Sequence, residues 1–219
     1  MIRLALEKNG RTPYRILCLG AHADDIEIGC GGAILEFLLR RRNVEFHWVV
    51  FSAENDRERE ARSSAELFLK GAAKKQVSIL GFRNGFFPSQ AGEIKEFFED
   101  LKDRLSPDLI LTHMRNDLHQ DHRVINELTW NTWRNHLILE YEIPKYDGDL
   151  GSPNLFVPFG RKTCERKVAY LLRCFKTQRD KHWFTKDTFL GLMRIRGIEA
   201  NSPGRYAEAF YARKLTLGS

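Results

Sequence analysis

The sequence lacks the segments that would mark a membrane, secreted or fibrous protein. It contains no run of about 18 apolar residues, so no membrane span is expected. Residues 1–15 lack the apolar core of a signal peptide, which favours a cytoplasmic protein. There is no internal repeat or low-complexity tract, and a hydrophobic content of 42% excludes a disordered chain. At 219 residues, the chain is expected to fold as a single domain spanning residues 1–219.

Cysteine is scarce, and the pattern of a zinc–sulfur site is missing. The four cysteines, Cys18, Cys30, Cys164 and Cys174, include no CxxC pair. Their flanking residues are apolar or glycine, which favours buried thiols in a reducing compartment over disulfides or metal ligands.

A dinucleotide-binding signature is missing as well. Gly29, Gly31 and Gly32 follow the first predicted strand, but Ile34 stands where GxGxxG requires its last glycine. The glycines also come later than a strand-to-helix phosphate turn, and acidic residues that would repel a pyrophosphate precede them. A dinucleotide cofactor is therefore not expected.

Acidic residues are under-represented near the C-terminus. The net charge is +6, but residues 161–219 hold 14 Lys and Arg against five Asp and Glu. Such an excess fits either a phosphate-bearing partner or a solvated helix face, and the sequence leaves both open. Because this stretch lacks the interleaved aromatic residues of a single-strand binder, no nucleic-acid partner is expected.

Short apolar runs alternate with stretches of helical periodicity through the first two thirds of the chain. Strands are predicted at 15–19, 44–51, 76–80 and 108–112, and helices at 27–42, 56–70, 92–105 and 121–135. This alternation predicts an α/β, Rossmann-like fold, a mostly parallel sheet with helices on both faces. A turn-rich stretch at 144–154 and helices at 161–175 and 186–194 predict a C-terminal elaboration of that fold.

Two polar clusters directly follow predicted strands, at residues 20–25 (GAHADD) and 113–122 (HMRNDLHQDH). Because ligands bind beyond the carboxyl ends of parallel strands, we expect the two clusters to meet at one edge of the sheet. His22 and Asp25 are separated by two residues, as are His119 and His122. Imidazole nitrogens and carboxylate oxygens are suitable zinc ligands, and a set of three leaves a position for water. The pattern indicates a metal site.

The motifs also resemble those of a known family, the LmbE-like or PIG-L N-deacetylases. Residues 21–32 (AHADDIEIGCGG) resemble the family's opening AHPDDxxxGxGG, and residues 119–122 (HQDH) its HPDH. Three further segments resemble its RxxE helix, its LGxxDG segment and its closing AEAF: residues 57–61 (REREA), 80–85 (LGFRNG) and 206–210 (YAEAF). The matches occur in the family's order and span nearly the whole chain.

The resemblance implies a zinc-dependent hydrolase that removes the acetyl group from an N-acetylglucosamine-type amino sugar. It implies that His22, Asp25 and His122 hold Zn²⁺ or another divalent metal. Homo-oligomers are common in the family, so a homo-oligomer is a further expectation.

The resemblance also implies roles for five further residues. Asp24 would be the general base, His119 would stabilise the oxyanion or protonate the leaving amine, and Asp121 would orient a histidine. Arg57 matches a substrate-binding arginine. Asn84 stands where the family often has Asp, which suggests an altered contact with a sugar hydroxyl.

Two departures and two alternative functions accompany this interpretation. Ala23 and Gln120 replace the prolines of the two motifs, which removes a fixed φ but no ligand. The alternatives are a metal-dependent amidase or esterase acting on another acyl group, and a non-catalytic protein that binds a sugar or phosphate ligand. The C-terminal basic excess suggests a substrate linked to a nucleotide or lipid through phosphate. His47, His136 and His182 match no motif and are assigned structural roles.

Overall fold

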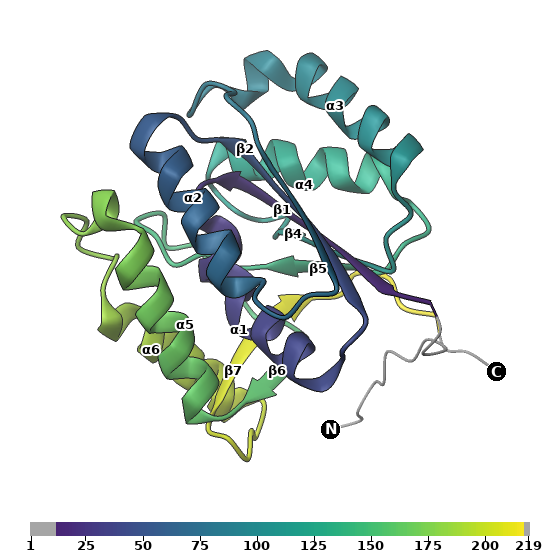
Figure 1. The fold of residues 1–219 in the computed structure, drawn as a ribbon. Coiled ribbons are helices and arrows are strands. Elements are labelled where there is room, and N and C mark those ends of the chain that lie inside the picture. Colours follow the sequence, from purple (N-terminus) through teal and green to yellow (C-terminus); the bar gives the residue numbers. More distant parts are fainter. Residues whose placement is uncertain (1–11, 217–219) are drawn as a thin grey trace.

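Within the described part of the chain, residues 12–216, seven strands form one mixed sheet (Figure 1). The structure is a computed structural model. Its strands are β1 (Tyr14–His22), β2 (Val44–Ser52), β3 (Lys74–Ile79), β4 (Leu109–His113), β5 (Ile138–Tyr141), β6 (Leu155–Phe159) and β7 (Tyr206–Tyr211). Their order is β3-β2-β1-β4-β5-β7-β6, in which the first five run parallel and β7 runs antiparallel to both neighbours. The expectation drawn from residues 1–15 lies mostly outside the described residues.

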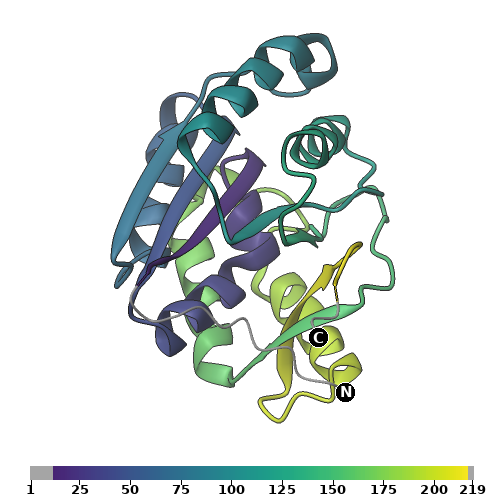
Figure 2. The same ribbon diagram turned by 90° about the vertical axis from the view of Figure 1, so that its right-hand side faces the viewer.

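Helices cover both faces of the sheet (Figures 1 and 2), which confirms the predicted α/β, Rossmann-like architecture. The described residues form α1 (Asp25–Arg40), α2 (Asn55–Phe68), α3 (Ala91–Arg104), α4 (Gln120–Thr132), α5 (Arg161–Cys174) and α6 (Lys186–Glu199), with short 3₁₀ helices η1 (Phe87–Gln90) and η2 (Lys176–Gln178). Helices α1, α2 and α5 pack together over one face, and α3 and α4 pack together over the other.

Strand β1 shows why the sheet separates two cores. Ile16 and Cys18 join the core beneath α1, α2 and α5, whereas Leu17 and Leu19 join the core beneath α3 and α4. Successive side chains of a strand point to opposite faces, so an unbroken apolar run supplies both cores. The four cysteines are buried and unbonded to one another, as predicted.

The C-terminal elaboration extends the sheet itself. The predicted helices 161–175 and 186–194 are α5 and α6, and the strands β5, β6 and β7 were not predicted. Strand β5 has only four residues, and β6 contains Pro158. Proline is tolerated in β6 because that strand lies at the edge of the sheet, where no further strand needs its N–H.

Helix α1 packs so closely against its neighbours that three of its positions have room only for glycine. A Cβ atom on Gly29 would lie 2.1 Å from the ring of Tyr141. One on Gly31 would lie 2.6 Å from Phe68, and Gly32 faces a similar clash. These glycines therefore serve helix packing and not a phosphate loop.

A buried ion pair ties helix α1 to the C-terminal elaboration. The Glu208 carboxylate accepts the backbone N–H groups of Gly32 and Ala33, each at 2.7 Å. Lys167 donates to Glu208 at 2.6 Å and to the carbonyl oxygen of Ile28 at 2.5 Å. Side chains from β7 and α5 thus form hydrogen bonds with backbone groups in the middle of α1. Through Glu208, the 206–210 motif holds a helix that lies far from it in the sequence.

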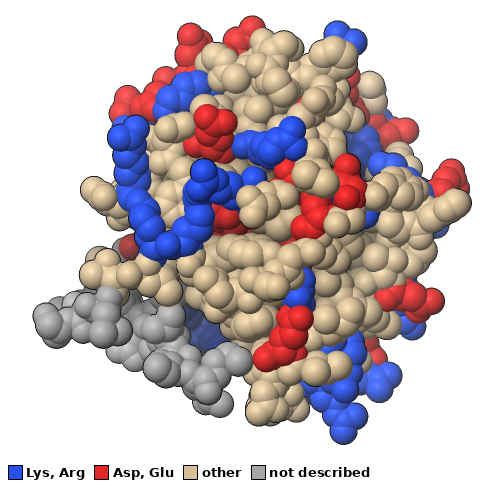
Figure 3. Space-filling model, turned by 180° about the vertical axis from the view of Figure 1, so that it is seen from behind, with Lys and Arg blue, Asp and Glu red and all other residues tan. Residues whose placement is uncertain are grey.

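The helices and the surface charges bear on the expectations about a membrane span and a basic C-terminal region. None of the helices within residues 12–216 is long and apolar enough to cross a membrane. Seen from behind, basic and acidic side chains are interspersed over the surface (Figure 3). Part of the C-terminal basic excess is used internally, because Lys167 pairs with Glu208 and Arg196 with Glu142, all four of them buried.

Candidate metal centre and pocket

The two polar clusters meet at the carboxyl edge of the sheet because β1 and β4 are neighbouring parallel strands. His22 is the last residue of β1, and Asp25 is the first residue of α1. His119 is the N-cap of α4, and His122 lies in that helix's first turn. Residues about 100 apart in the sequence therefore face one another.

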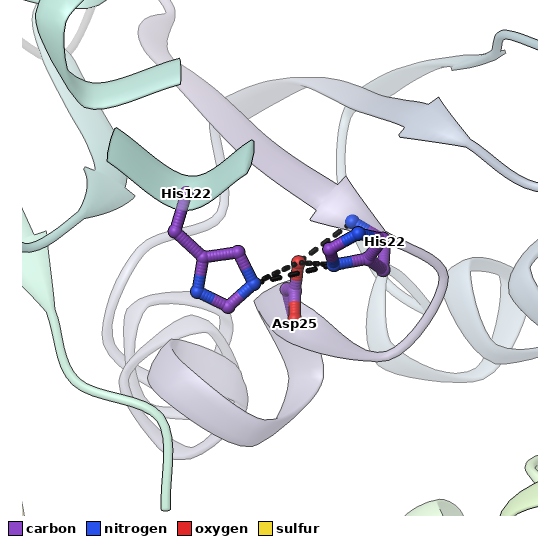
Figure 4. Close-up of side chains that lie close together, drawn as sticks. All are labelled: His22, Asp25 and His122. Atoms are coloured by element: carbon purple, nitrogen blue, oxygen red, sulfur yellow. Dashed lines mark hydrogen bonds and ion pairs between the residues drawn. The ribbon is translucent and has the colours of Figure 1, made fainter. Parts of the chain in front are cut away.

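Three donor atoms converge on one point at this edge (Figure 4). Nδ1 of His22 lies 3.2 Å from Nε2 of His122 and 3.3 Å from Oδ2 of Asp25, and the latter two atoms are 3.5 Å apart. Ligands at 2.0–2.2 Å from a tetrahedral zinc ion are separated by about 3.3–3.6 Å. The spacing and chemistry of this donor set therefore fit one such divalent cation.

The second nitrogen of each histidine faces a carboxylate. Nε2 of His22 lies 3.2 Å from Oδ2 of Asp121, and Nδ1 of His122 lies 2.9 Å from Oδ2 of Asp117. Such carboxylates fix the orientation of a ligating imidazole and raise its basicity. Asp121 is itself held by the backbone N–H groups of Gly85 and Phe87.

Burial and mutual charge shift the pKa values of all three donors. Burial alone would raise the pKa of Asp25, but His122, His113 and His22 reverse the effect and hold it well below its usual range. Burial likewise opposes the charge on His22, yet Asp25 and Asp121 raise its pKa to about 10. The pKa of His122 falls to about 4 through burial and the neighbouring His113. Since ligating histidines must be neutral, a bound cation would take over the role of the proton on His22.

Asp24 lines the same pocket as the three donors, and its two carboxylate oxygens differ in their contacts with the described residues. Its Oδ1 accepts a hydrogen bond from Nη2 of Arg57 at 2.6 Å. Its Oδ2 is buried and has no hydrogen-bond partner within residues 12–216. Arg57 also pairs with Glu60 at 3.3 Å. The guanidinium predicted to bind substrate therefore already serves to orient Asp24.

The site opens into a pocket of about 660 Å³. The predicted site residues His22, Asp24, Asp25, Arg57, Asn84, His119 and His122 all line it. Asp121 lies beneath the pocket wall and is fully buried. The C-terminal quarter reaches the pocket through Gln178, Lys181 and Trp183. His47, His136 and His182 take no part in the pocket or in the metal-spaced groups of the described residues.

Two of the four Lys and Arg side chains that line the pocket form no ion pair with the acidic residues of the described chain. Arg57 and Lys145 form ion pairs with acidic residues. The guanidinium of Arg83 lies 3.6 Å from the ring centre of Phe86, and no ion pair joins it to the described acidic residues. Lys181 likewise lies near Trp183, at 5.6 Å, and is free of ion pairs within the described chain.

Sequence reasoning missed His113, Asp117 and Lys145. His113 is buried, accepts the N–H of Ala21 at 3.0 Å and stacks on His122 with ring centres 3.9 Å apart. Its only sequence signal is its position directly after an apolar strand. Asp117 lies in the second polar cluster, but no spacing distinguishes it there, and Lys145 lies in a stretch that indicates only turns.

A sequence comparison identifies the family. The family model described as PIG-L, GlcNAc-PI de-N-acetylase, matches residues 17–133. Comparison with curated protein sequences gives no match.

Solved structures share the fold at low sequence identity. An N,N'-diacetylchitobiose deacetylase from Pyrococcus horikoshii is 20% identical, with 91% of this chain and 84% of that chain covered and a TM-score of 0.65. The 4-carboxy-2-hydroxymuconate hydratase GalB from Pseudomonas putida is 16% identical, with 94% and 98% covered and a TM-score of 0.73. The teicoplanin deacetylase Orf2 in its zinc-inhibited form is 12% identical, with 90% and 97% covered and a TM-score of 0.66. The similarity establishes the fold, which carries more than one reaction.

Proposed function

This chain belongs to the PIG-L, or LmbE-like, family, and on that premise we propose that it is a metal-dependent N-deacetylase of an N-acetylglucosamine-type amino sugar. One observation carries the proposal. Three donor atoms spaced for a single divalent cation share a pocket with a buried carboxylate oxygen, Oδ2 of Asp24, that has no hydrogen-bond partner in residues 12–216. A metal site and a free base are what hydrolysis of an amide by water requires.

His22, Asp25 and His122 would hold the ion, which we propose to be zinc or a similar divalent metal. When bound there, such an ion lowers the pKa of a water ligand to about 7 and polarises an acyl carbonyl. Asp121 and Asp117 would keep the two imidazoles in the required orientation, because each accepts a hydrogen bond from the nitrogen that faces away from the cation.

Asp24 would accept the proton of the attacking water on Oδ2 as the water oxygen bonds to the acyl carbon, and would pass that proton to the amine nitrogen as the C–N bond breaks. The ion pair between Oδ1 and Arg57 fixes the plane of the carboxylate and leaves Oδ2 for the water. A general base held in this way contributes about 10²–10⁴-fold to the rate. A protein that only bound sugar would have no use for a buried, unpartnered carboxylate oxygen, which disfavours the non-catalytic alternative.

His119 would stabilise the negative charge that develops on the acyl oxygen. Its Nδ1 accepts the N–H of Asp121 at 3.2 Å, so the neutral ring carries its proton on Nε2 and can donate into the pocket. Burial and the nearby His22 lower the pKa of His119, which favours this neutral form at pH 7. The ring thus caps helix α4 through one nitrogen and serves the reaction through the other.

The rest of the pocket would recognise the sugar. Trp183 offers an apolar ring wall, and Asn84 offers an amide for a sugar hydroxyl. Arg83 and Lys181, which lack ion-pair partners among the described residues, would hold an anionic substituent such as a phosphate that links the sugar to a nucleotide or lipid. On this basis a phosphate-linked sugar would be a better substrate than the free sugar.

Acetate release by the zinc-loaded protein tests the proposal directly. The substrates are N-acetylglucosamine, its 1-phosphate and its uridine diphosphate conjugate, and a simple acetyl ester serves as a control. We expect acetate from the amino sugars, with the highest kcat/KM for a phosphate-linked one. Acetate from the ester alone would favour the amidase or esterase alternative. No release from any compound by zinc-loaded protein would overturn the proposed activity.

A further inference from the structure

The segment between β5 and β6 carries a lysine, Lys145, whose side chain is largely shielded from solvent and reaches the carboxylate that faces His122. Nζ of Lys145 lies 3.1 Å from Oδ1 of Asp117, and it also forms an ion pair with Asp149. The side chains of Lys145, Asp117 and Asp149 are 8%, 0% and 3% exposed. Taking three charged groups out of water is costly unless each is paired, so this arrangement is specific and not a chance surface contact.

Asp117 is the link between this lysine and the donor set. Its Oδ2 accepts from Nδ1 of His122 at 2.9 Å. Its Oδ1 accepts the backbone N–H of His119 at 2.8 Å and also faces Lys145. Lys145 therefore supplies the only cationic side chain paired with Asp117 within residues 12–216. Without it, the buried carboxylate that orients His122 would keep that imidazole and one backbone N–H as partners but would have no cation beside it.

Asp149 ties the same segment to the loop that precedes helix α4. Its Oδ2 accepts the backbone N–H of Leu118 at 2.8 Å and pairs with Lys145. Tyr146 and Asp147, between the two anchors, line the pocket. The clamp formed by Lys145 and Asp149 thus contacts the metal-orienting carboxylate on one side and positions a stretch of pocket wall on the other.

We propose that Lys145 is a positioning residue of the metal centre, which acts through Asp117 on His122 and couples metal binding to the pocket wall at residues 145–149. The inference rests on the proposed metal site but not on the identity of the substrate. A cation at His122 draws the Nδ1 proton of that ring toward Asp117, and a fixed, charged Asp117 strengthens this hydrogen bond. Neutralising position 145 should therefore weaken metal binding although the lysine contacts no metal ligand.

The first experiment is a zinc affinity measurement on the full chain, by competition with a chromophoric chelator. The variants are Lys145→Met, Lys145→Arg and, as a matched control, Lys162→Met, because Lys162 is exposed on helix α5. Loss of a residue that orients a metal ligand typically costs about 10–100-fold in affinity, and we expect Lys145→Met to bind zinc at least about 10-fold more weakly. Lys145→Arg should restore most of this loss because it keeps the charge, and Lys162→Met should match the wild type.

A second readout separates positioning from a merely structural role. The thermal midpoint of each protein is measured in chelator and in zinc, together with amide exchange at Leu118 and residues 145–149. We expect zinc to slow exchange at these amides in the wild type and much less in Lys145→Met. Equal zinc affinity in Lys145→Met and wild type would overturn the inference, even if the variant melted earlier in chelator. Absence of zinc binding by the wild type would overturn the metal site and this inference together. Failure of acetate release by protein that binds zinc would overturn only the proposed activity.

Discussion

The chain divides near residue 135 into two regions that serve the pocket in different ways. The N-terminal region supplies the three proposed metal ligands and Asp24, all within short motifs at the ends of β1 and β4. The C-terminal region supplies Lys145, Lys181 and Trp183 to the pocket wall and Glu208 to the interior of α1. The family match also ends at residue 133. The proposed reacting groups therefore come from local motifs, whereas part of the pocket wall comes from segments without a local signature.

The proposed difference between the two regions would be lost if the N-terminal motifs did not hold a metal. We expect His122→Ala to lose the roughly one zinc ion per chain of the wild type and to lower acetate release to background, because two donors remain of three. Elemental mass spectrometry of the purified proteins measures the metal. His182→Ala is the matched control, since His182 is exposed and belongs to none of the metal-spaced groups of the described residues. Full zinc content in His122→Ala would show that the site is built from other residues.

Asp24 tests whether the N-terminal region carries a base in addition to the ligands. Asp24→Asn should lower kcat by about 10²–10⁴-fold while zinc content stays unchanged, because an amide cannot accept the proton. Glu60→Gln is the control, since Glu60 pairs with the same arginine but lies outside the pocket lining. A kcat within a few-fold of the wild type in Asp24→Asn would assign the base to another residue.

Glu208 probes the structural contribution of the C-terminal region. Glu208→Ala leaves Lys167 buried without its counter-ion and removes a carboxylate that accepts two N–H groups of α1, and we expect it to lower the free energy of unfolding by about 3–5 kcal/mol. Denaturant unfolding measures the change. Glu165→Ala removes an exposed ion pair of helix α5 and should cost about 0–1 kcal/mol. If both variants were equally stable, the 206–210 motif would have no role in holding α1.

The smallest effect is expected at the mouth of the pocket. Arg83→Met and Lys181→Met should each raise KM for a phosphate-linked sugar by roughly 3- to 10-fold, since each removes one solvent-accessible charge. KM for the neutral sugar should not change, and the difference should shrink at high salt. Lys162→Met is again the control. Equal effects on neutral and phosphate-linked sugars would show that these residues do not select for charge.

Much of the N-terminal region could be predicted because its signals are local. The apolar run that forms β1 and the periodic stretch that forms α1 can each be recognised within a short window of the sequence. The meeting of His22 and His122 follows from one rule, that parallel strands end at the same edge of a sheet. The spacing of three donor atoms within 3.5 Å does not follow from the sequence, because it depends on the side-chain rotamers and on the adjacent carboxylates.

The C-terminal region was harder to predict for a physical reason. Strand β7 pairs with β5, about 70 residues earlier, and with the short, proline-containing β6. Pairing at such separations leaves little trace in local hydrophobic periodicity. The basic excess of residues 161–219 can be counted in the sequence. The sequence does not show which of these side chains are buried in ion pairs and which face the pocket. Lys167 is buried against Glu208, while Lys181 faces the pocket.

The sequence by itself determined the fold class, the order of the first elements and which residue types stand at the edge of the sheet, because periodicity, turn residues and motif spacing act over a few residues. Only the tertiary structure decided which oxygen of Asp24 lacks a hydrogen-bond partner among the described residues. It also decided that Asp121 and Asp117 each face a different histidine, and that Lys145 pairs with Asp117. These facts depend on contacts between segments distant in the chain, where burial makes every charge require a partner.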